Sequence, residues 1–397
     1  MVVHAYFPLA EPRVQREAAA ARDAGFAVTV LALRGDGEPA RETVDGIEVH
    51  RIRLSHRRGA GLGRILYEYV AFCLLASMQL AAWSARDPFD LVHVHNPPDF
   101  LILAGLLPRA RGARLILDVH DLSSHMFAVR VGGLLGRIAC RILAWIERAA
   151  CAVADHVITV HEPYRAELIG HGVEARKVAV VMNGADERIL RRASAMGPAV
   201  ERSASFRVAY HGTLTWWYGA DLIVEAVARL RADGMDVDVV ILGDGDQVPH
   251  LREEVRRRRL SGCVHISGRY LPIEAALASV AVADCGVIPN RPSQINRFAL
   301  SSKLLEYVAL GVPVVVARLE TLAAHFGEDE VTFFDAGDAG ALAEAVRWVH
   351  QHPREARARA VRAQRRAERY AWSRSRATLQ QLYDRLLSDG RPVRGSA

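Results

Sequence analysis

Residues 283–317 read ADCGVIPNRPSQINRFALSSKLLEYVALGVPVVVA, and their order of apolar and polar segments predicts the fold class. An apolar run ends at Pro289, a polar loop follows, and helical periodicity covers residues 299–310. Gly311 is expected to end that helix, because glycine readily adopts the left-handed backbone of helix ends, and Pro313 opens the next apolar run. A strand, a helix and a second strand in this order predict a parallel βαβ unit.

The same alternation extends to both sides of this stretch. Apolar runs such as AVTVLAL, LVHVHN and RLILDVH alternate with helical patterns in the first half, and FRVAYHG and VDVVILGDG begin the second. Residues 191–205, RRASAMGPAVERSAS, are small and polar and predict a linker. A chain of 397 residues is also too long for one ordinary core. We therefore expect an α/β protein with two Rossmann-like, doubly wound parallel-sheet domains, 1–190 and 206–369, that face each other across a cleft.

Composition is typical of a globular protein of the cytoplasm. Half of the residues are apolar and 24% are charged. The five cysteines are odd in number and scattered, which favours reduced thiols, and the opening MVVHAYFP lacks the pattern of a secretory signal. We expect a cytoplasmic protein that is not exported.

The formal net charge of +6 comes almost entirely from arginine, because only Lys177 and Lys303 are lysine. A GC-rich genome would produce this excess, and so would attraction to phosphates or to an anionic membrane surface. Composition leaves both interpretations open. We expect no nucleic-acid partner.

Residues 64–83, RILYEYVAFCLLASMQLAAW, are nearly continuous in apolar residues over roughly the ~20 positions that a bilayer span needs. Glu68 interrupts the run, and Arg57 and Arg58 precede it. Three interpretations stay open: a buried helix of the first domain, a helix that lies in a membrane interface, and a true span. The second would bring residues 57–83 into peripheral contact with the inner face of the cell membrane.

The start of the 299–310 helix is the candidate nucleotide site. Ser302 lies where free backbone amides and the positive end of the helix dipole favour a phosphate, and Lys303 adds a mobile cation. Glu306, one turn further on the same face, could accept both hydrogen bonds from the vicinal hydroxyls of a ribose. The alternative is a surface helix on which Lys303 and Glu306 only pair with each other.

The segment SSKLLEYVALGVPVVVA strongly resembles the C-terminal signature of glycosyltransferase family 4 (group 1), whose members have the GT-B fold. The segments YFPLAEPRVQREAAAARDAGFAVTVLAL, YHGTLTWWYGADLIVEAVARL and ILGDGD also resemble the family and occur in its order. The resemblance implies a retaining transferase that uses a nucleotide diphosphate sugar, usually without a metal. It implies an acceptor-binding domain at 1–190, a donor-binding domain at 206–369, and a last helix, 370–390, that crosses back to the first domain.

This chain departs from the family pattern at three positions of the donor site. Glu306 matches the second glutamate of the family's E-x7-E motif, but Phe298 replaces the first. Thr213 and Tyr218 stand where many members place the arginine and the lysine that clamp the diphosphate. A related branch of the family also lacks the first acid, so we interpret the chain as an active variant.

Other groups are then expected to bind the diphosphate, namely the backbone amides of Gly212 and Thr213 and the side chains of Arg297 and Lys303. The complete predicted donor site comprises Gly212, Thr213, Gly243, Arg269, Ser302, Lys303 and Glu306. Trp216 and Trp217 could stack on the donor, face the other domain or pack in the core, and we place Trp217 among the cleft-lining residues.

In the first domain, LILDVHD ends with His120 and Asp121 at the sheet edge that should face the cleft. His120 matches a histidine that lies beside the reacting sugar in the family, so we assign it to the catalytic residues together with Lys303 and Arg297. Its expected role is to bind the donor sugar or to position the acceptor hydroxyl.

Arg13 opens the first helix, and we expect it to line the cleft with Asp121 and to approach the diphosphate or the acceptor. His93 and His95 lie on one face of a strand, as metal ligands can, but no third ligand follows at a suitable spacing. We interpret these two histidines as packing residues and expect neither a metal nor a cofactor.

The predicted function is transfer of a sugar, with retention, from a UDP-sugar to a hydroxyl of a lipid-linked or cell-envelope glycan. No paired carboxylates suit a double displacement, so front-face substitution with closure of the domains is the expected mechanism. Three alternatives stay open: a glycosyltransferase acting on a small secondary metabolite, a GT-B-like UDP-sugar 2-epimerase, and a non-catalytic nucleotide-sugar-binding protein.

Overall fold

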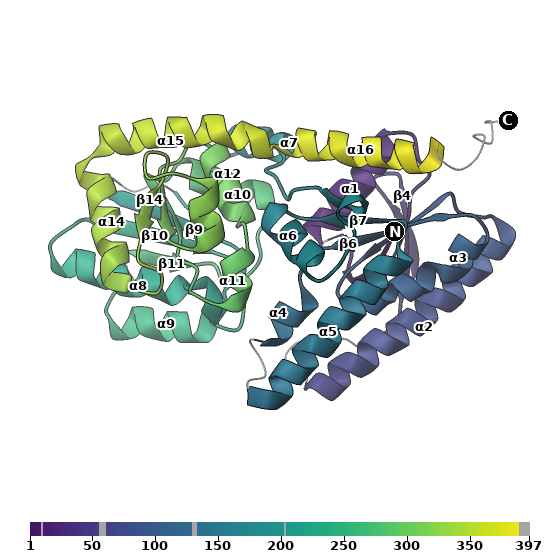
Figure 1. Ribbon diagram of the computed structural model, residues 1–397. Helices are drawn as coiled ribbons and strands as arrows, with labels where there is room; N and C mark the ends of the chain where they lie inside the picture. The colour runs from purple at the N-terminus through teal and green to yellow at the C-terminus, as the bar shows by residue number, and fades with distance from the viewer. Residues whose placement is uncertain (9–10, 55–60, 129–132, 202–203, 389–397) are drawn as a thin grey trace. The chain divides into compact units, whose positions relative to one another are not determined.

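The computed structural model describes residues 1–397 except 9–10, 55–60, 129–132, 202–203 and 389–397 (Figure 1). The chain divides into two compact units. Unit 1 comprises Met1–Met182 and Ser375–Ala397, and unit 2 comprises Asn183–Arg374. Each unit contains one sheet, and each is described by itself below.

The sheet of unit 1 has eight strands in the order β3-β4-β2-β1-β5-β6-β7-β8. Every pair is parallel except β3 with β4. The central strands are almost wholly buried, as expected of a parallel sheet covered on both faces. The strands are β1 (Val2–Tyr6), β2 (Thr29–Leu33), β3 (Arg41–Val44), β4 (Ile47–Ile52), β5 (Leu91–His95), β6 (Arg114–Val119), β7 (His156–Thr159) and β8 (Val178–Val180).

Helical segments connect these strands. They are α1 (Pro12–Asp23), α2 (Leu62–Arg86), η1 (Asp99–Gly105), α3 (Leu106–Ala110), α4 (Ser123–Ala128), α5 (Gly133–Val153), α6 (Glu162–Gly170) and η2 (Ala175–Lys177). The parallel alternation predicted from the sequence is confirmed apart from the β3–β4 hairpin. Asp45 and Gly46 join those two strands with φ values of 50° and 76°, the left-handed conformation of a tight hairpin turn.

The sheet of unit 2 has six parallel strands in the order β11-β10-β9-β12-β13-β14. The strands are β9 (Phe206–His211), β10 (Val237–Leu242), β11 (Val264–Ile266), β12 (Cys285–Ile288), β13 (Val314–Ala317) and β14 (Thr332–Phe334). Its helical segments are α7 (Glu187–Ala195), η3 (Trp216–Tyr218), α8 (Ala220–Ala232), α9 (Val248–Arg257), α10 (Ile273–Ala281), α11 (Gln294–Phe298), α12 (Ser302–Ala309), α13 (Glu320–His325), α14 (Ala339–Gln351), α15 (Pro353–Ala367) and η4 (Glu368–Tyr370).

The βαβ unit at 283–317 forms with one change. The predicted helix 299–310 begins only at α12, because Ala299 and Ser301 have extended backbone ψ values of 121° and 119° and separate it from the short helix α11. Tyr307 of α12 packs closely on β12, because a Cβ atom at Gly286 would lie 2.4 Å from the tyrosine ring. The glycine therefore lets α12 approach the sheet.

The boundary between the units differs from the predicted linker. Unit 2 already begins at Asn183, and residues 191–195 of the predicted linker belong to α7. The last helix, α16 (Trp372–Ser388), returns to unit 1 from Ser375 onward, where Tyr383 is buried and Gln380 bonds the carbonyl of Ala20. Residues 202–203 of the predicted linker and 389–390 of the predicted last helix lie outside the described residues.

Helix α2 contains the apolar segment 64–83. Its length and composition would allow a membrane span, but Phe72, Ala76 and Leu80 are buried within unit 1. In its most apolar 18-residue window only 28% of the residues are buried. The helix is thus attached to the domain by one stripe, while the opposite stripe is exposed. Residues 57–60 of the predicted membrane contact lie outside the described part of the chain.

Candidate functional site

The carboxyl ends of β9 and β10 form the floor of the candidate site in unit 2. A Cβ atom at Gly243 would lie 1.8 Å from the carbonyl oxygen of Gly212, so the loops after these strands touch through backbone alone. The Gly212 amide donates to the Leu242 carbonyl at 2.8 Å, and the Gly243 amide donates to the Ser267 hydroxyl at 2.8 Å. Gly212 and Gly243 therefore use their amides within the fold, and the Gly212 amide is not free to bind a phosphate as predicted.

Lys303 lies against this floor from the first turn of α12. A Cβ atom at Gly212 would be 2.8 Å from the Lys303 Cε, so the glycine leaves room for the lysine chain. The Lys303 ammonium lies 4.5 Å from the centre of the Tyr218 ring, a cation–π contact. Burial lowers the pKa of Lys303, and the charge of Glu306 opposes this shift. The structure thus brings Gly212, Tyr218, Lys303 and Glu306 together.

The N-terminus of α12 is open to an anion. Ser301 is the N-cap residue, but its side chain makes no capping bond, and its hydroxyl is buried without a hydrogen-bond partner among the described residues. Ser302, the next residue, is exposed. The first amides of a helix lack partners within the helix and, with the helix dipole, attract negative charge.

Two residues that sequence reasoning missed hold Glu306 in place. His211, the last residue of β9, has its Nε2 atom 3.1 Å from Glu306 Oε2. The Tyr307 hydroxyl accepts from the His211 amide at 2.9 Å and lies 3.0 Å from His211 Nδ1. If Nε2 carries the proton toward the carboxylate, Nδ1 is the acceptor and Tyr307 donates to it. In the sequence, the only indications of these two residues were the histidine of the segment YHG and the tyrosine that follows Glu306.

Arg297 does not join Lys303. It lies on α11, where its side chain is 54% exposed and donates to Glu320 of α13 at 2.7 Å. Its guanidinium also lies 5.0 Å from the ring centre of Phe298, the residue in place of the family's first acid. The predicted catalytic use of Arg297 would require this ion pair to open.

Trp217 and Arg269 have mainly local roles. The Trp217 carbonyl accepts from the Arg291 amide at 2.9 Å and from the Asn296 side chain at 2.7 Å, which connects η3 to α11 and to the loop before it. The neighbouring Trp216 is 53% exposed, with the Arg291 guanidinium 4.9 Å from its ring centre. Arg269 is exposed in the loop after β11, and its carbonyl accepts from the Ser267 hydroxyl.

Unit 1 carries a buried charged cluster, which we call the Arg13 cluster (Arg13, Glu17, His93, His95, Asp118 and His120). Arg13 donates to both oxygens of Asp118 at 2.8 and 2.9 Å and to the Val181 carbonyl at 2.7 Å, and it lies 3.1 Å from Glu17. Arg13 is only 3% exposed. Its guanidinium therefore links α1 to β6 and to the residue directly after β8. Its burial corrects the expectation that Arg13 lines a cleft.

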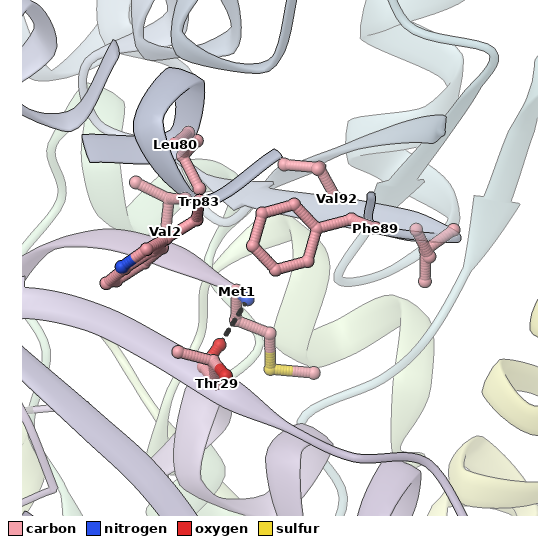
Figure 2. Close-up of a pocket in the computed structure, with 8 residues that line it drawn as sticks. Met1, Val2, Thr29, Leu80, Trp83, Phe89 and Val92 are labelled. Atoms are coloured by element: carbon pink, nitrogen blue, oxygen red, sulfur yellow. Dashed lines mark hydrogen bonds between the residues drawn. The ribbon is translucent and has the colours of Figure 1, made fainter. Parts of the chain in front are cut away.

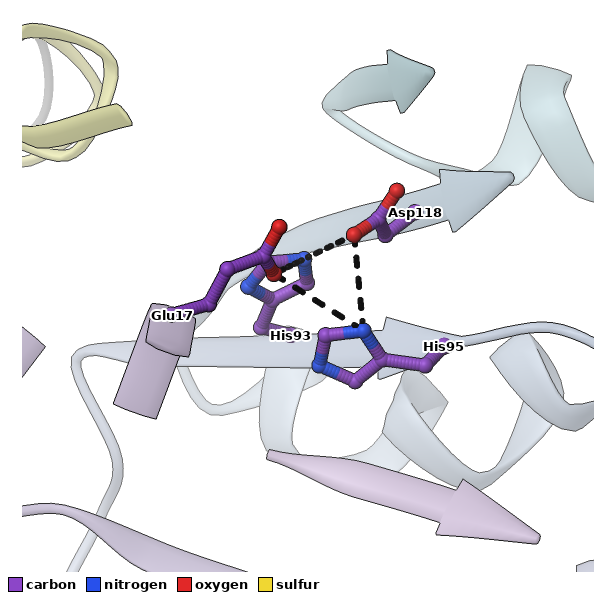
Figure 3. A group of neighbouring side chains, drawn as sticks. All are labelled: Glu17, His93, His95 and Asp118. Carbon is purple, nitrogen blue, oxygen red and sulfur yellow. Dashed lines mark ion pairs between the residues drawn. The ribbon is translucent and has the colours of Figure 1, made fainter. Parts of the chain in front are cut away.

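Four members of this cluster have the composition of a metal site. Ligand atoms of Glu17, His93, His95 and Asp118 lie within 4.8 Å of one another (Figure 3). The sequence missed the two carboxylates because they come from α1 and β6, far along the chain. A positive charge is already supplied there by Arg13, which occupies both oxygens of Asp118. The geometry therefore fits a buried ion-pair network better than a metal centre.

His120 lies at the exposed margin of the cluster, directly after β6. Its Nε2 atom is 3.1 Å from His95 Nδ1 and 3.2 Å from Asp118 Oδ2, and its side chain is 11% exposed. Burial lowers the pKa of His120, but the charge of Asp118 and the hydrogen bond to it together outweigh burial, so the pKa is raised. Asn96 fixes the backbone here by accepting from the His120 amide and donating to the Asp121 carbonyl, each at 2.7 Å.

A small hollow at the opposite end of the same sheet carries no such chemistry. It is lined by Met1, Val2, Thr29, Leu80, Trp83, Phe89, Leu91 and Val92 (Figure 2). Met1, Thr29 and Leu91 stand at the amino ends of parallel strands, whereas His120 follows a carboxyl end. The Met1 ammonium donates to the Thr29 carbonyl at 2.7 Å, and burial lowers its pKa to about 5. Ligands of such sheets bind at the carboxyl ends, so we assign this hollow to packing.

Glu17 should make the stability of unit 1 depend on pH. Burial raises the pKa of Glu17 to about 8, although Arg13 opposes the shift. A raised folded-state pKa gives stability that is complete below the unfolded pKa and is lost as pH rises through 8. Gln keeps the shape of the protonated side chain. The free energy of unfolding of Glu17→Gln, relative to that of the wild type, should therefore rise by roughly 1 kcal/mol per pH unit between pH 6 and 8. Urea unfolding at several pH values, followed in unit 1 by hydrogen exchange, measures this gain.

The comparison of the two proteins isolates Glu17 from other groups that titrate in this range. The Met1 ammonium, with its lowered pKa, favours the folded state as pH rises, but it does so equally in both proteins. Unfolding free energies that stay parallel from pH 6 to 8 would show that Glu17 is ionised in the folded state, and would contradict the raised pKa of this carboxyl group.

Both units match known protein families. Residues 10–184 match the family described as Glycosyl transferase 4-like domain, and residues 205–352 match the Glycosyl transferases group 1. The computed structure is similar to that of sucrose-phosphate synthase from Thermosynechococcus elongatus, with a TM-score of 0.74 and 18% identity over 95% of this chain and 93% of that one.

Several curated proteins are similar in sequence. Glycogen synthase of Mycobacterium tuberculosis is 27% identical over 74% of this chain and 68% of that protein. D-inositol 3-phosphate glycosyltransferase of Kineococcus radiotolerans is 25% identical over 94% and 89%. A Mycobacterium tuberculosis protein named GDP-mannose-dependent alpha-(1-6)-phosphatidylinositol dimannoside mannosyltransferase is 31% identical over 40% and 39%.

Proposed function

Because this chain belongs to the GT-B glycosyltransferases, with a 4-like domain followed by a group 1 domain, we propose that it transfers a sugar from UDP, with retention, to a lipid-linked or cell-envelope acceptor. Membership in this family makes the chain a transferase. The epimerase and the non-catalytic binding protein considered above are therefore set aside.

The position of Lys303 carries the proposal. Its ammonium lies at the open N-terminus of α12, against Gly212, and the carboxylate of Glu306 follows one turn later. A nucleoside diphosphate has the matching sequence of groups, with ribose hydroxyls for Glu306 and phosphates for the helix amides and Lys303. Glu306 is 17% exposed and lies beside His211, whose Nε2 is 3.1 Å from Glu306 Oε2, so the carboxylate is held in place and can still be reached by a hydroxyl donor.

The chemistry that follows is a front-face substitution. The bond between the anomeric carbon and the diphosphate oxygen breaks, and the acceptor oxygen bonds the same face of that carbon. The acceptor proton passes to the departing diphosphate oxygen. Lys303 and the α12 amides stabilise the negative charge that develops on the leaving group. His120 binds a sugar hydroxyl or positions the acceptor, and its partner Asp118 keeps it available as a hydrogen-bond donor.

This mechanism needs neither a metal nor a cofactor. Lys303 and the free amides of α12 supply positive charge where a divalent cation would otherwise balance the diphosphate. Transfer activity should therefore be the same with EDTA and with added Mg²⁺.

The donor base and the acceptor are proposed on different grounds. UDP is common in the family that the sequence resembles, although one relative is named as GDP-mannose-dependent. That relative's name also contains phosphatidylinositol dimannoside, a lipid-linked glycan. The exposed apolar stripe of α2 in unit 1 supports an acceptor of this kind and a peripheral position on the cytoplasmic face of the membrane.

Thermal unfolding with a panel of nucleotides and nucleotide sugars tests the donor site. At 100 times its Kd, a ligand that binds only the folded protein adds about 2.7 kcal/mol to its stability, which raises the melting temperature by several degrees. We expect a selective shift with one nucleoside diphosphate sugar and loss of that shift in Glu306→Ala. A melting-temperature shift that occurs only with GDP-sugars would support the proposed transfer reaction but would show that the donor carries guanine in place of uracil.

Glu344→Ala is the matched control. Glu344 lies on α14 of the same unit, where its side chain is 71% exposed and pairs with Arg347. This variant should keep the full ligand-induced shift. Equal loss of the shift in both variants, or no shift with any nucleotide, would contradict the proposed donor site.

A further inference from the structure

Unit 1 presents an exposed apolar surface of unusual extent. Fourteen of the eighteen exposed large hydrophobic residues in the described part of the chain lie on α2, η1, α3 and α5. We call this the α2–α5 face and define it by Leu62, Leu66, Tyr67, Val70, Leu74, Leu75, Met78, Leu103, Leu106, Leu107, Leu134, Ile138, Ile142 and Trp145. Contiguous apolar surface of this kind marks a site of interaction with another body.

The elements that carry this face pack on one another. On α2, Leu66, Val70, Leu74 and Met78 recur every four residues and form the stripe opposite the buried one. On α5 the exposed residues run from Leu134 to Trp145 at spacings of four, four and three. Segment η1 packs against both α2 and α5, and α3 packs against α2, so the elements that carry these stripes are neighbours in unit 1. Figure 1 shows α2, α3 and α5 in the same part of the unit.

The exposed charges on these elements all have the same sign. Their carboxylates, Glu68, Asp99 and Glu147, are buried, at 1%, 2% and 0% exposed. Glu68 pairs with Arg64 and Glu147 with His171, each at 2.8 Å. The exposed charged residues on the helices are Arg64, Arg86, Arg109, Arg137, Arg141 and Arg148. An apolar face edged by arginine is complementary to a surface with an apolar interior and anionic headgroups.

We propose that the α2–α5 face docks unit 1 onto an anionic phospholipid bilayer, with its leucine and isoleucine side chains in the acyl boundary and its arginines among the headgroups. Tyr67 and Trp145, 58% and 69% exposed, are side chains suited to the interfacial layer. The helix α2 lies in the interface and does not cross it, because Phe72, Ala76 and Leu80 are committed to the core of unit 1.

The charge pattern favours a bilayer over a second copy of the chain. In a two-fold dimer the same surface meets itself, so arginines would face arginines with no exposed carboxylate of these elements to pair with them. The docking surface also does not depend on which sugar the protein transfers. Its test therefore needs neither donor nor acceptor, and a failure of the proposed reaction would leave it standing.

Vesicle flotation with the full chain tests the proposal. We expect the wild type to float with vesicles that contain 30 mol% phosphatidylglycerol in phosphatidylcholine, to bind pure phosphatidylcholine at least tenfold more weakly, and to be released in part by 0.5 M NaCl. Leu74→Glu and Trp145→Glu should each weaken binding at least tenfold, because each places a carboxylate in the apolar boundary. Both positions are more than half exposed, so folding should be kept.

Val361→Glu is the matched control, since Val361 is 43% exposed on α15 of unit 2. It should float like the wild type, and all three variants should keep the wild-type melting temperature. Equal binding to neutral and anionic vesicles would overturn the role of the arginines. Absence of vesicle binding together with a dimer in light scattering that Trp145→Glu dissociates would overturn the proposal and make the face an interface between copies.

Discussion

Replacing Lys303 by alanine should lower kcat about 10²- to 10³-fold and leave the KM for the acceptor within a few-fold of the wild type. The ammonium lies at the open end of α12, in the half-buried contact with Gly212 and Tyr218. There it meets the diphosphate in surroundings where charge is poorly screened, and the negative charge of that group grows as the sugar leaves. An interaction that strengthens in the transition state affects turnover more than binding.

The chain provides its own control for this variant. Lys177 is the other lysine of the sequence, and it donates to the Ala154 carbonyl at 2.9 Å in unit 1. Lys177→Ala should keep normal turnover. Normal turnover in Lys303→Ala would show that this lysine does not stabilise the leaving group. The helix amides alone would then have that role.

A second readout does not depend on activity. Because burial lowers the pKa of Lys303, its amine is deprotonated more often near neutral pH than that of an ordinary lysine. An amine-reactive reagent should therefore modify Lys303 faster than Lys177, as measured by peptide mass spectrometry. A bound nucleoside diphosphate should protect Lys303 and leave the labelling of Lys177 unchanged. Protection of neither lysine at saturating nucleotide would contradict contact between Lys303 and the phosphates.

The sequence predicted the parallel strands well because buried strands are apolar runs bounded by turns. It missed β3, whose residues RETV are half polar and alternate between exposed and half-buried positions. The signal for this hairpin was present in Asp45-Gly46, a dipeptide typical of two-residue turns. The hairpin was not predicted because the prediction followed the alternation of strands and helices along the chain and did not use this dipeptide.

The candidate site was predictable where its residues are neighbours in sequence. Lys303 and Glu306 share one turn of a helix, so periodicity alone places them together. His211 is 95 positions before Glu306, and only the pairing of β9 with β12 and the packing of α12 bring their side chains within 3.1 Å. Contacts of this kind require the folded sheet and do not follow from spacing.

The sequence also did not predict how exposed individual side chains of the helices are. Apolar residues recur at helical spacing on α5, and nothing in that spacing shows that Ile142 and Trp145 are more than half exposed. Arg13 stands at the start of a helix, where a charged residue is normally solvated, yet it is 3% exposed. Hydrophobic periodicity identifies the faces of a helix and does not say what covers them.

Arg13→Met should destabilise unit 1 by about 3 to 5 kcal/mol, because it leaves Asp118 as a buried charge without its main partner. Asp118 is fully buried and receives two hydrogen bonds from Arg13. The double variant Arg13→Met/Asp118→Asn removes the charge as well, and it should recover a large part of the loss. Hydrogen exchange under native conditions localises the effect to unit 1, and the nucleotide-induced shift of unit 2 should persist.

The pH dependence of these variants distinguishes a structural role from a catalytic one. In the wild type, burial would raise the pKa of Asp118, but Arg13 and His120 lower it well below its usual range. That contribution to stability is present at neutral pH and is lost as pH falls through the folded-state pKa. Without Arg13, burial dominates and raises the pKa of Asp118. Arg13→Met should therefore gain stability on acidification relative to the wild type, down to the pH at which Asp118 is protonated when unfolded.

The opposite outcome would support the role that the sequence alone suggested for Arg13. If Arg13→Met unfolds at the wild-type urea concentration at every pH but loses transfer activity, its guanidinium contacts a substrate and its bonds to Asp118 do not stabilise the fold. The geometry argues against this, because the guanidinium already binds Asp118, the Val181 carbonyl and Glu17 and is almost entirely buried. A ligand could reach it only by breaking contacts on which the arrangement of α1, β6 and the end of β8 depends.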